Sequence, residues 1–160
     1  MAEDEVVIEH PNRDAPASKA TRAIVVALLL ITAVLLAVVT IGGWDALTGA
    51  RALQVAWIVL DVGMAVLVLR WNRGVLPVVA ALALLLGIFA LVGAPAWFDR
   101  DKAGFVSTGL DASLLGVLTV LIAPVQLLLI AFAMQGFRQA WNVEVERRPH
   151  DGAQTAPAPA

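Results

Sequence analysis

One carboxyl group lies inside an otherwise apolar stretch of the chain. Asp61 is near the middle of residues 52–69, and no other charged residue occurs there. An ionisable side chain at bilayer depth is rare and by default indicates a functional site, so Asp61 could bind and release a proton or coordinate a cation. Alternatively, a protonated Asp61 could hydrogen-bond to Gln126, or to a backbone carbonyl freed by Pro124, and hold helices together. The lack of a second buried charge favours this alternative.

Two further polar residues are expected close to this carboxyl group. If the first apolar stretch runs outward through the membrane and the fourth runs inward, Thr32 and Gln126 come within about one helical turn of the depth of Asp61. All three side chains could then meet inside a helix bundle. The sequence predicts an intramembrane polar cluster of Asp61, Gln126 and Thr32.

Several kinds of catalytic and metal chemistry are excluded by residues that the sequence lacks. There is no cysteine, which removes disulfides, thiolate nucleophiles, iron–sulfur clusters and cysteine-ligated zinc. His10 and His150 lie in polar segments, which excludes a membrane haem between paired histidines and leaves a membrane serine nucleophile without a base. An intramembrane aspartyl protease would need a second carboxyl group beside Asp61. We therefore predict no catalytic, cofactor-binding or metal-binding residues, no cofactor and no enzymatic activity.

The segment after the third apolar stretch is acidic. Asp99 and Asp101 would occupy positions one and three of a calcium-binding loop, with Gly104 at position six. Ala103 and Leu110 stand at positions five and twelve, where such a loop needs oxygen ligands. This shortfall favours a solvated acidic turn over a calcium site.

Small residues recur at spacings of three and four along the third apolar stretch, which places them on one face of a helix. Such a face lets a neighbouring helix approach closely within a membrane. Ala83, Gly87 and Ala90 form the centre of this helix-packing face, between Ala80 and Ala94. We expect the face to pack inside the chain's own bundle, and a contact between copies of the chain is the alternative.

The elements that must position these residues are membrane-spanning helices. Of the 160 residues, 60% are hydrophobic and only 15% are charged, which is more apolar surface than a small soluble core could bury. A helix needs about 20 apolar residues to cross a hydrocarbon core about 30 Å thick. Such runs cover residues 23–43, 52–69, 75–94 and 113–134. The sequence predicts an all-α, polytopic membrane protein, with a four-transmembrane-helix bundle over residues 22–142 and disordered cytoplasmic tails at residues 1–21 and 143–160.

The placement of lysine and arginine predicts the orientation, because these residues near helix ends resist transfer across the membrane. The side that holds most of them should be cytoplasmic and should contain both termini: Arg13, Lys19, Arg22, Arg70, Arg73, Arg138, Arg147 and Arg148. The other side would hold Arg51, Arg100 and Lys102. Tryptophans suited to the headgroup layer fall at the predicted helix ends: Trp44, Trp71, Trp97 and Trp141. We expect a multi-pass protein of the inner or plasma membrane.

Residues 135–146, which run from Gln135 through Trp141 to Glu146, follow the segment Ala123-Pro124-Val125-Gln126. On these residues, the last third of the chain resembles small uncharacterised four-helix actinobacterial membrane proteins. The resemblance implies a bacterial membrane protein and carries no activity with it.

Two hypotheses for function follow. The first is a non-enzymatic accessory or scaffold component of a membrane assembly, because small-residue faces are present and catalytic groups are not. The second is a small proton- or cation-coupled carrier that uses Asp61. The expected partners are the lipid bilayer and either further copies of the chain or a larger membrane complex. No basic block, zinc pattern or aromatic platform suggests nucleic-acid binding.

Overall fold

The computed structural model of the chain describes residues 7–102 and 104–147. Four long helices dominate it: α2 (Pro16–Gly42), α3 (Arg51–Leu69), α4 (Leu76–Phe98) and α5 (Ala112–Arg138). Each of these helices is long and apolar enough to cross a membrane. The prediction of an all-α bundle of four membrane-spanning helices is confirmed, and the chain has the build of a multi-pass membrane protein.

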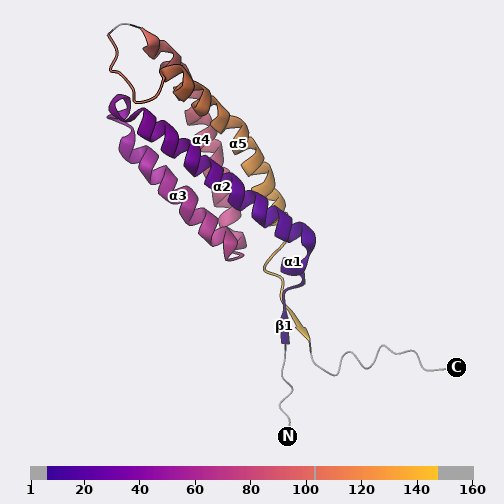
Figure 1. Ribbon diagram of the computed structural model, residues 1–160. Helices are drawn as coiled ribbons and strands as arrows, with labels where there is room; N and C mark the ends of the chain where they lie inside the picture. Colours follow the sequence, from indigo (N-terminus) through magenta and orange to yellow (C-terminus); the bar gives the residue numbers. More distant parts are fainter. Residues whose placement is uncertain (1–6, 103, 148–160) are drawn as a thin grey trace, which may run out of the picture.

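The four helices run up and down in one elongated bundle (Figure 1). Short 3₁₀ helices occupy the connections: η1 (Trp44–Leu47) after α2, η2 (Arg73–Val75) after α3 and η3 (Asp99–Asp101) after α4. Because the chain crosses the bundle an even number of times, its first and last described residues lie at the same end. We call this the terminal end, and the opposite one the distal end.

The helices contact one another unequally. α4 and α5 form the most extensive pair, and α2 packs against both α3 and α5. The predicted small-residue face belongs to this packing, since Ala83 and Ala90 are buried. A Cβ atom on Gly87 would lie 3.4 Å from the Cβ atom of Gln126 on α5. The small residues of α4 thus serve the close approach of α4 and α5 within the chain.

α3 is the most exposed of the four helices. Its buried residues follow one face at spacings of three and four: Trp57, Asp61, Ala65 and Val68. The opposite face consists of exposed apolar side chains, such as Val59, where an aqueous surface helix would carry polar residues. The Trp57 ring reaches α4 and meets the Phe89 ring edge-on, with the centroids 6.0 Å apart. α3 therefore packs against α2 and contacts α4 through side chains.

Local signals account for several helix ends. Asp111 caps α5, because its Oδ1 accepts a hydrogen bond from the backbone N–H of Leu114 at 3.1 Å. Pro16 opens α2, where the missing N–H of proline costs nothing. The apolar pattern places the end of the third helix at residue 94, but α4 continues to Phe98 with Pro95 inside it. Membrane helices tolerate an internal proline when neighbouring groups satisfy the freed carbonyl.

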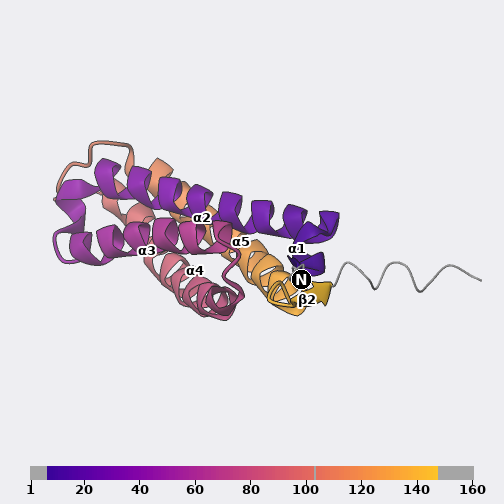
Figure 2. The same cartoon turned by 90° about the horizontal axis from the view of Figure 1, so that it is seen from below.

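Short elements precede and follow the four helices, within residues 7–21 and 143–147, where the sequence analysis predicts tails. β1 (Val7–Glu9) pairs antiparallel with β2 (Val145–Arg147), and α1 (Pro11–Asp14) leads directly into α2. Figures 1 and 2 show these short elements gathered at the terminal end. The physical reason is that each tail supplies hydrogen-bond partners to the other, which offsets the entropy of ordering. Residues 1–6 and 148–160 lie outside the described residues.

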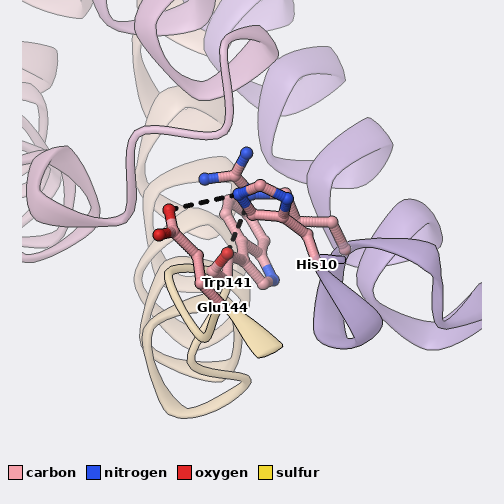
Figure 3. Close-up of polar contacts among 4 residues, drawn as sticks. His10, Trp141 and Glu144 are labelled. Carbon is pink, nitrogen blue, oxygen red and sulfur yellow. Dashed lines mark hydrogen bonds and ion pairs between the residues drawn. The ribbon is translucent and has the colours of Figure 1, made fainter. Parts of the chain in front are cut away.

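Side chains join the two tails in a cluster that we call the terminal clasp: His10, Arg13, Trp71, Trp141 and Glu144. Figure 3 shows His10, Trp141 and Glu144 of this cluster. Nε2 of His10 lies 3.2 Å from Oε1 of Glu144, and Nε of Arg13 donates to the backbone carbonyl of Trp141 at 2.8 Å. The Trp141 ring is fully buried and packs edge-on against Trp71, with centroids 5.2 Å apart. The clasp therefore closes the terminal end of the bundle and is continuous with its apolar core.

Candidate functional site

Asp61 lies at the middle of α3, on the buried face of that helix. Its side chain is 5% exposed, and its Oδ2 has no hydrogen-bond partner among the described residues. Buried polar atoms in proteins are nearly always paired, so an unpaired carboxyl oxygen is unusual. An ionised carboxylate without a partner is also expensive in apolar surroundings. A bound proton or a bound cation would therefore stabilise the Asp61 carboxyl group.

The other two residues of the predicted cluster meet each other. Nε2 of Gln126 on α5 donates a hydrogen bond to Oγ1 of Thr32 on α2 at 2.9 Å, and both side chains are buried. The Thr32 hydroxyl donates in turn to the backbone carbonyl of Leu28 at 2.9 Å. Within the described part of the chain, Asp61 hydrogen-bonds to neither Thr32 nor Gln126, nor to a backbone carbonyl. The pair thus ties α2 to α5, while Asp61 remains apart on α3.

A groove opens between α3 and α4 toward the distal end, with a volume of about 350 Å³. Leu36 of α2, Leu86 of α4 and Ile122 of α5 line its apolar inner part. The Trp57 ring lines the groove as well. Trp57 precedes Asp61 by four residues, so the two share a helix face and are about 6 Å apart along the axis. The groove therefore ends about one helical turn from the buried carboxyl group.

Polar groups gather where the groove reaches the distal end. The Arg100 guanidinium lies 5.5 Å from the centroid of the Trp97 ring and donates to the backbone carbonyl of Ala46 at 3.4 Å. Gln54 of α3 is hydrogen-bonded to Thr40 of α2, which ties these helices together at the wall of the groove. None of the described residues that line the groove is acidic. Arg100 is thus the single charged residue in the described lining of the groove.

Two carboxylates of the acidic distal segment have separate partners. Oδ1 of Asp99 accepts a hydrogen bond from Nζ of Lys102 at 2.9 Å, and Asp111 is engaged as the cap of α5. Over residues 7–102 and 104–147, no group of three or more histidine, cysteine or acidic side chains is placed to hold a metal ion. Ala103, at position five of the calcium pattern, lies outside the described residues.

The groove is a feature that the sequence analysis missed. The sequence predicts helix-end positions for four tryptophans and gives no role to Trp57. A signal was present, because Gln54, Trp57 and Asp61 recur at spacings of three and four along one apolar helix and so mark a single face. The opposite wall comes from α4. The distance between α3 and α4 depends on the angle at which the two helices diverge. The residue pattern within one helix carries no information about that angle.

The buried face of α3 is the centre of the candidate site. It carries Asp61 at mid-depth, Trp57 one turn nearer the distal end and Gln54 beside the mouth of the groove. Such an arrangement can exchange a proton at the carboxyl group, and it can accept an elongated molecule from the side of the bundle. No protein-family model, no curated protein and no solved structure matches the chain.

Proposed function

We propose that the chain is a non-enzymatic, multi-pass protein of the cell membrane that acts as a small proton- or cation-coupled carrier through Asp61. The observation that carries this proposal is the buried Oδ2 of Asp61, which lacks a hydrogen-bond partner among the described residues. A carboxyl group that served only to join helices would be expected to bond to a neighbouring helix. Gln126, the neighbour with which the sequence would pair it, is bonded to Thr32 instead.

A proton suits this site better than a metal cation. Metal cations of the hard type take several oxygen ligands, whereas a proton needs one. Asp61 is the only acidic residue within the four helices α2 to α5. The polar side chains nearest to it in depth, Thr32 and Gln126, already satisfy each other. The expected event is therefore uptake of a proton by Asp61 and its release when the surroundings of α3 change.

The charge distribution supports an orientation with both termini in the cytoplasm. Positive residues near helix ends stay on the cytoplasmic side. The terminal end carries most of those that are described: Arg13, Lys19, Arg22, Arg70, Arg73 and Arg138. The distal end carries Arg51, Arg100 and Lys102. In this orientation the mouth of the groove faces the outside of the cell.

Reconstitution into liposomes tests the role of Asp61. We expect wild-type protein to dissipate an imposed pH gradient, reported by a trapped pH-sensitive dye, and Asp61→Asn to lose this flux, because asparagine keeps the shape but cannot exchange a proton at the same site. Asp45→Asn is the matched control, since Asp45 lies at the distal end and pairs with Arg51 at 3.7 Å. Equal flux through wild type and Asp61→Asn would overturn the proposal, and so would a wild-type protein without flux.

An accessory or scaffold role is the second candidate. The small-residue face of α4 is one reason to consider a scaffold role, but the packing of Gly87 against Gln126 uses that face inside the chain. The exposed apolar face of α3 remains as a surface for a partner, although lipid covers such a face equally well. A wild-type protein that carries no protons but is recovered with a defined partner in mild detergent would favour this second role.

A further inference from the structure

The groove between α3 and α4 contains groups that proton binding at Asp61 does not use. Its volume of about 350 Å³ falls within the range of ligand-binding pockets, roughly 300 to 1,000 Å³. Leu53 of α3 and Phe89 of α4 line it and are exposed, so it is open between two neighbouring helices that each have an exposed apolar surface. A molecule that already resides in the bilayer could therefore enter it without passing through water.

The depth of the groove corresponds to one leaflet. The wall on α4 extends from Leu86 to Trp97, and Arg100 follows in η3. At 1.5 Å per residue, the distance along the axis from Leu86 to Arg100 is about 21 Å. Half of a hydrocarbon core about 30 Å thick is about 15 Å. The groove thus extends from the headgroup layer at the distal end to near the middle of the bilayer.

Arg100 is the only charged residue among the described residues that line the groove. Its guanidinium forms no ion pair with any side chain that the structure describes, and the neighbouring Asp99 is paired with Lys102. An occupant with negative charge at the headgroup layer would complement this group.

A second hollow adjoins the mouth of the groove and shares Arg100 with it. Residues 105–112 of the distal connection form its wall, and its volume is about 420 Å³. Its lining is mostly polar and includes Ser107, Thr108 and the Asp111 carboxylate, which is engaged as the cap of α5. Arg100 therefore stands between an apolar groove and a polar hollow, which is the division between the tail and the headgroup of an amphiphile.

The chemistry of the lining decides between an acyl chain and a partner's helix. The groove is apolar, and it meets a polar hollow at Arg100, which matches the tail and the charged headgroup of one lipid. We propose that it binds one anionic phospholipid of the distal leaflet, with an acyl chain between Trp57 and Phe89 on one side and Leu36 on the other and with the phosphate on Arg100. This site does not depend on proton exchange at Asp61.

Native mass spectrometry of the full chain in mild detergent tests the proposal. The protein is titrated with phosphatidylglycerol and, separately, with phosphatidylcholine that carries the same acyl chains. We expect one phosphatidylglycerol to bind about tenfold more tightly than phosphatidylcholine, the scale of a charge-assisted hydrogen bond. Arg100→Gln should remove this preference. Arg51→Gln is the matched control, because Arg51 lies at the same end, stacks on Trp44 at 4.7 Å and is already paired with Asp45.

A second pair of variants tests the acyl-chain part of the groove. Gly93 lines the groove and has no atom within 4 Å of the position of a Cβ atom, so Gly93→Leu adds an apolar side chain at the groove without a clash at its Cβ atom. It should weaken the binding of both lipids at least tenfold. Gly63 of α3 has equally open surroundings and does not line the groove, so Gly63→Leu should bind lipid as the wild type does.

Three outcomes would overturn the proposal: no preference for phosphatidylglycerol in the wild type, an equal loss in Arg100→Gln and Arg51→Gln, or unchanged binding in Gly93→Leu. The second outcome would mean that both variants act through the overall charge of the distal end and not through a site at Arg100. If Gly93→Leu does not fold, as judged by its elution profile, the arginine pair decides the question alone.

Discussion

Breaking the hydrogen bond between Thr32 and Gln126 has different consequences for the two side chains. The Thr32 hydroxyl still has the backbone carbonyl of Leu28 as its acceptor. Nε2 of Gln126 has no second acceptor among the described residues. An unpaired buried donor costs the full desolvation penalty of that group, whereas replacing a polar side chain by an apolar one of similar shape costs less.

We therefore predict that Thr32→Val lowers the free energy of unfolding by about 1 to 3 kcal/mol, because it leaves the buried amide of Gln126 without a hydrogen-bond acceptor. Gln126→Met should lower it by less, about 1 kcal/mol or below, because it removes the group that would be stranded. Unfolding in detergent micelles, followed by circular dichroism, measures both values. A larger loss in Gln126→Met than in Thr32→Val would contradict this account of the pair.

The polar cluster also shows how far residue-level reasoning extends. Rise per residue predicted a common depth for Thr32, Gln126 and Asp61. The structure bonds the first two to each other and places Asp61 on a buried face of another helix, without a bond to either. Depth follows from counting residues along a helix. The rotation of each helix about its axis, which decides which side chains face one another, follows from packing around the whole circumference.

At the scale of the elements, the end of α2 approaches the end of α4 at the distal side of the bundle. A Cβ atom on Gly43 would clash with the ring of Trp97. That ring is 6% exposed, so it has little room to move away. The absence of a side chain at Gly43 is therefore what allows the first connection to pass over α4, and it also fixes the position of one wall of the groove.

Gly43→Ala should lower the free energy of unfolding by about 1 to 3 kcal/mol, the usual range for overpacking. Gly49 lies in the same connection and has no atom within 4 Å of a Cβ position. Gly49→Ala should change the free energy by less than about 0.5 kcal/mol. Thermal unfolding of both variants in the same detergent compares them directly. Equal midpoints for the two variants would show that the contact with Trp97 adapts without cost.

The ends of the helices show a similar difference between what the sequence predicts and what the structure contains. Apolar runs predicted helices at residues 23–43 and 113–134, and the structure extends both: α2 begins at Pro16 and α5 ends at Arg138. Hydropathy reports the length that lipid covers. The additional turns are held by contacts at the terminal end, such as the hydrogen bond from Gln139 to Thr21 at 3.0 Å, which joins residues far apart in the chain.

For the whole molecule, the terminal clasp brings the first and last described residues to one end of the bundle. His10 and Glu144 are separated by 134 positions in the sequence and are in contact. An even number of crossings requires both ends to lie on one side of the membrane. The proposed orientation assigns that side to the cytoplasm, because most of the positive residues are there.

Reporter fusions at the two ends of the chain check this orientation. Green fluorescent protein should fluoresce at both the amino and the carboxyl terminus, and alkaline phosphatase should be inactive at both, because the first works in the cytoplasm and the second outside it. Alkaline phosphatase inserted beside Gly104, in the distal connection, is the control and should be active. Opposite results at the two termini would contradict the even number of crossings.

The sequence by itself determined that lipid surrounds the four helices, how many times the chain crosses it and the approximate limits of each crossing. The reason is that the cost of burying charge in lipid depends on the composition of about 20 consecutive residues and hardly on neighbouring helices. It also singled out Asp61, since one charge in an apolar run stands out. Only the tertiary structure decided the partners. The bond between Thr32 and Gln126, the groove beside Trp57 and the clasp of the two tails each join residues from different elements, and their contacts depend on how rigid helices lean and rotate against one another.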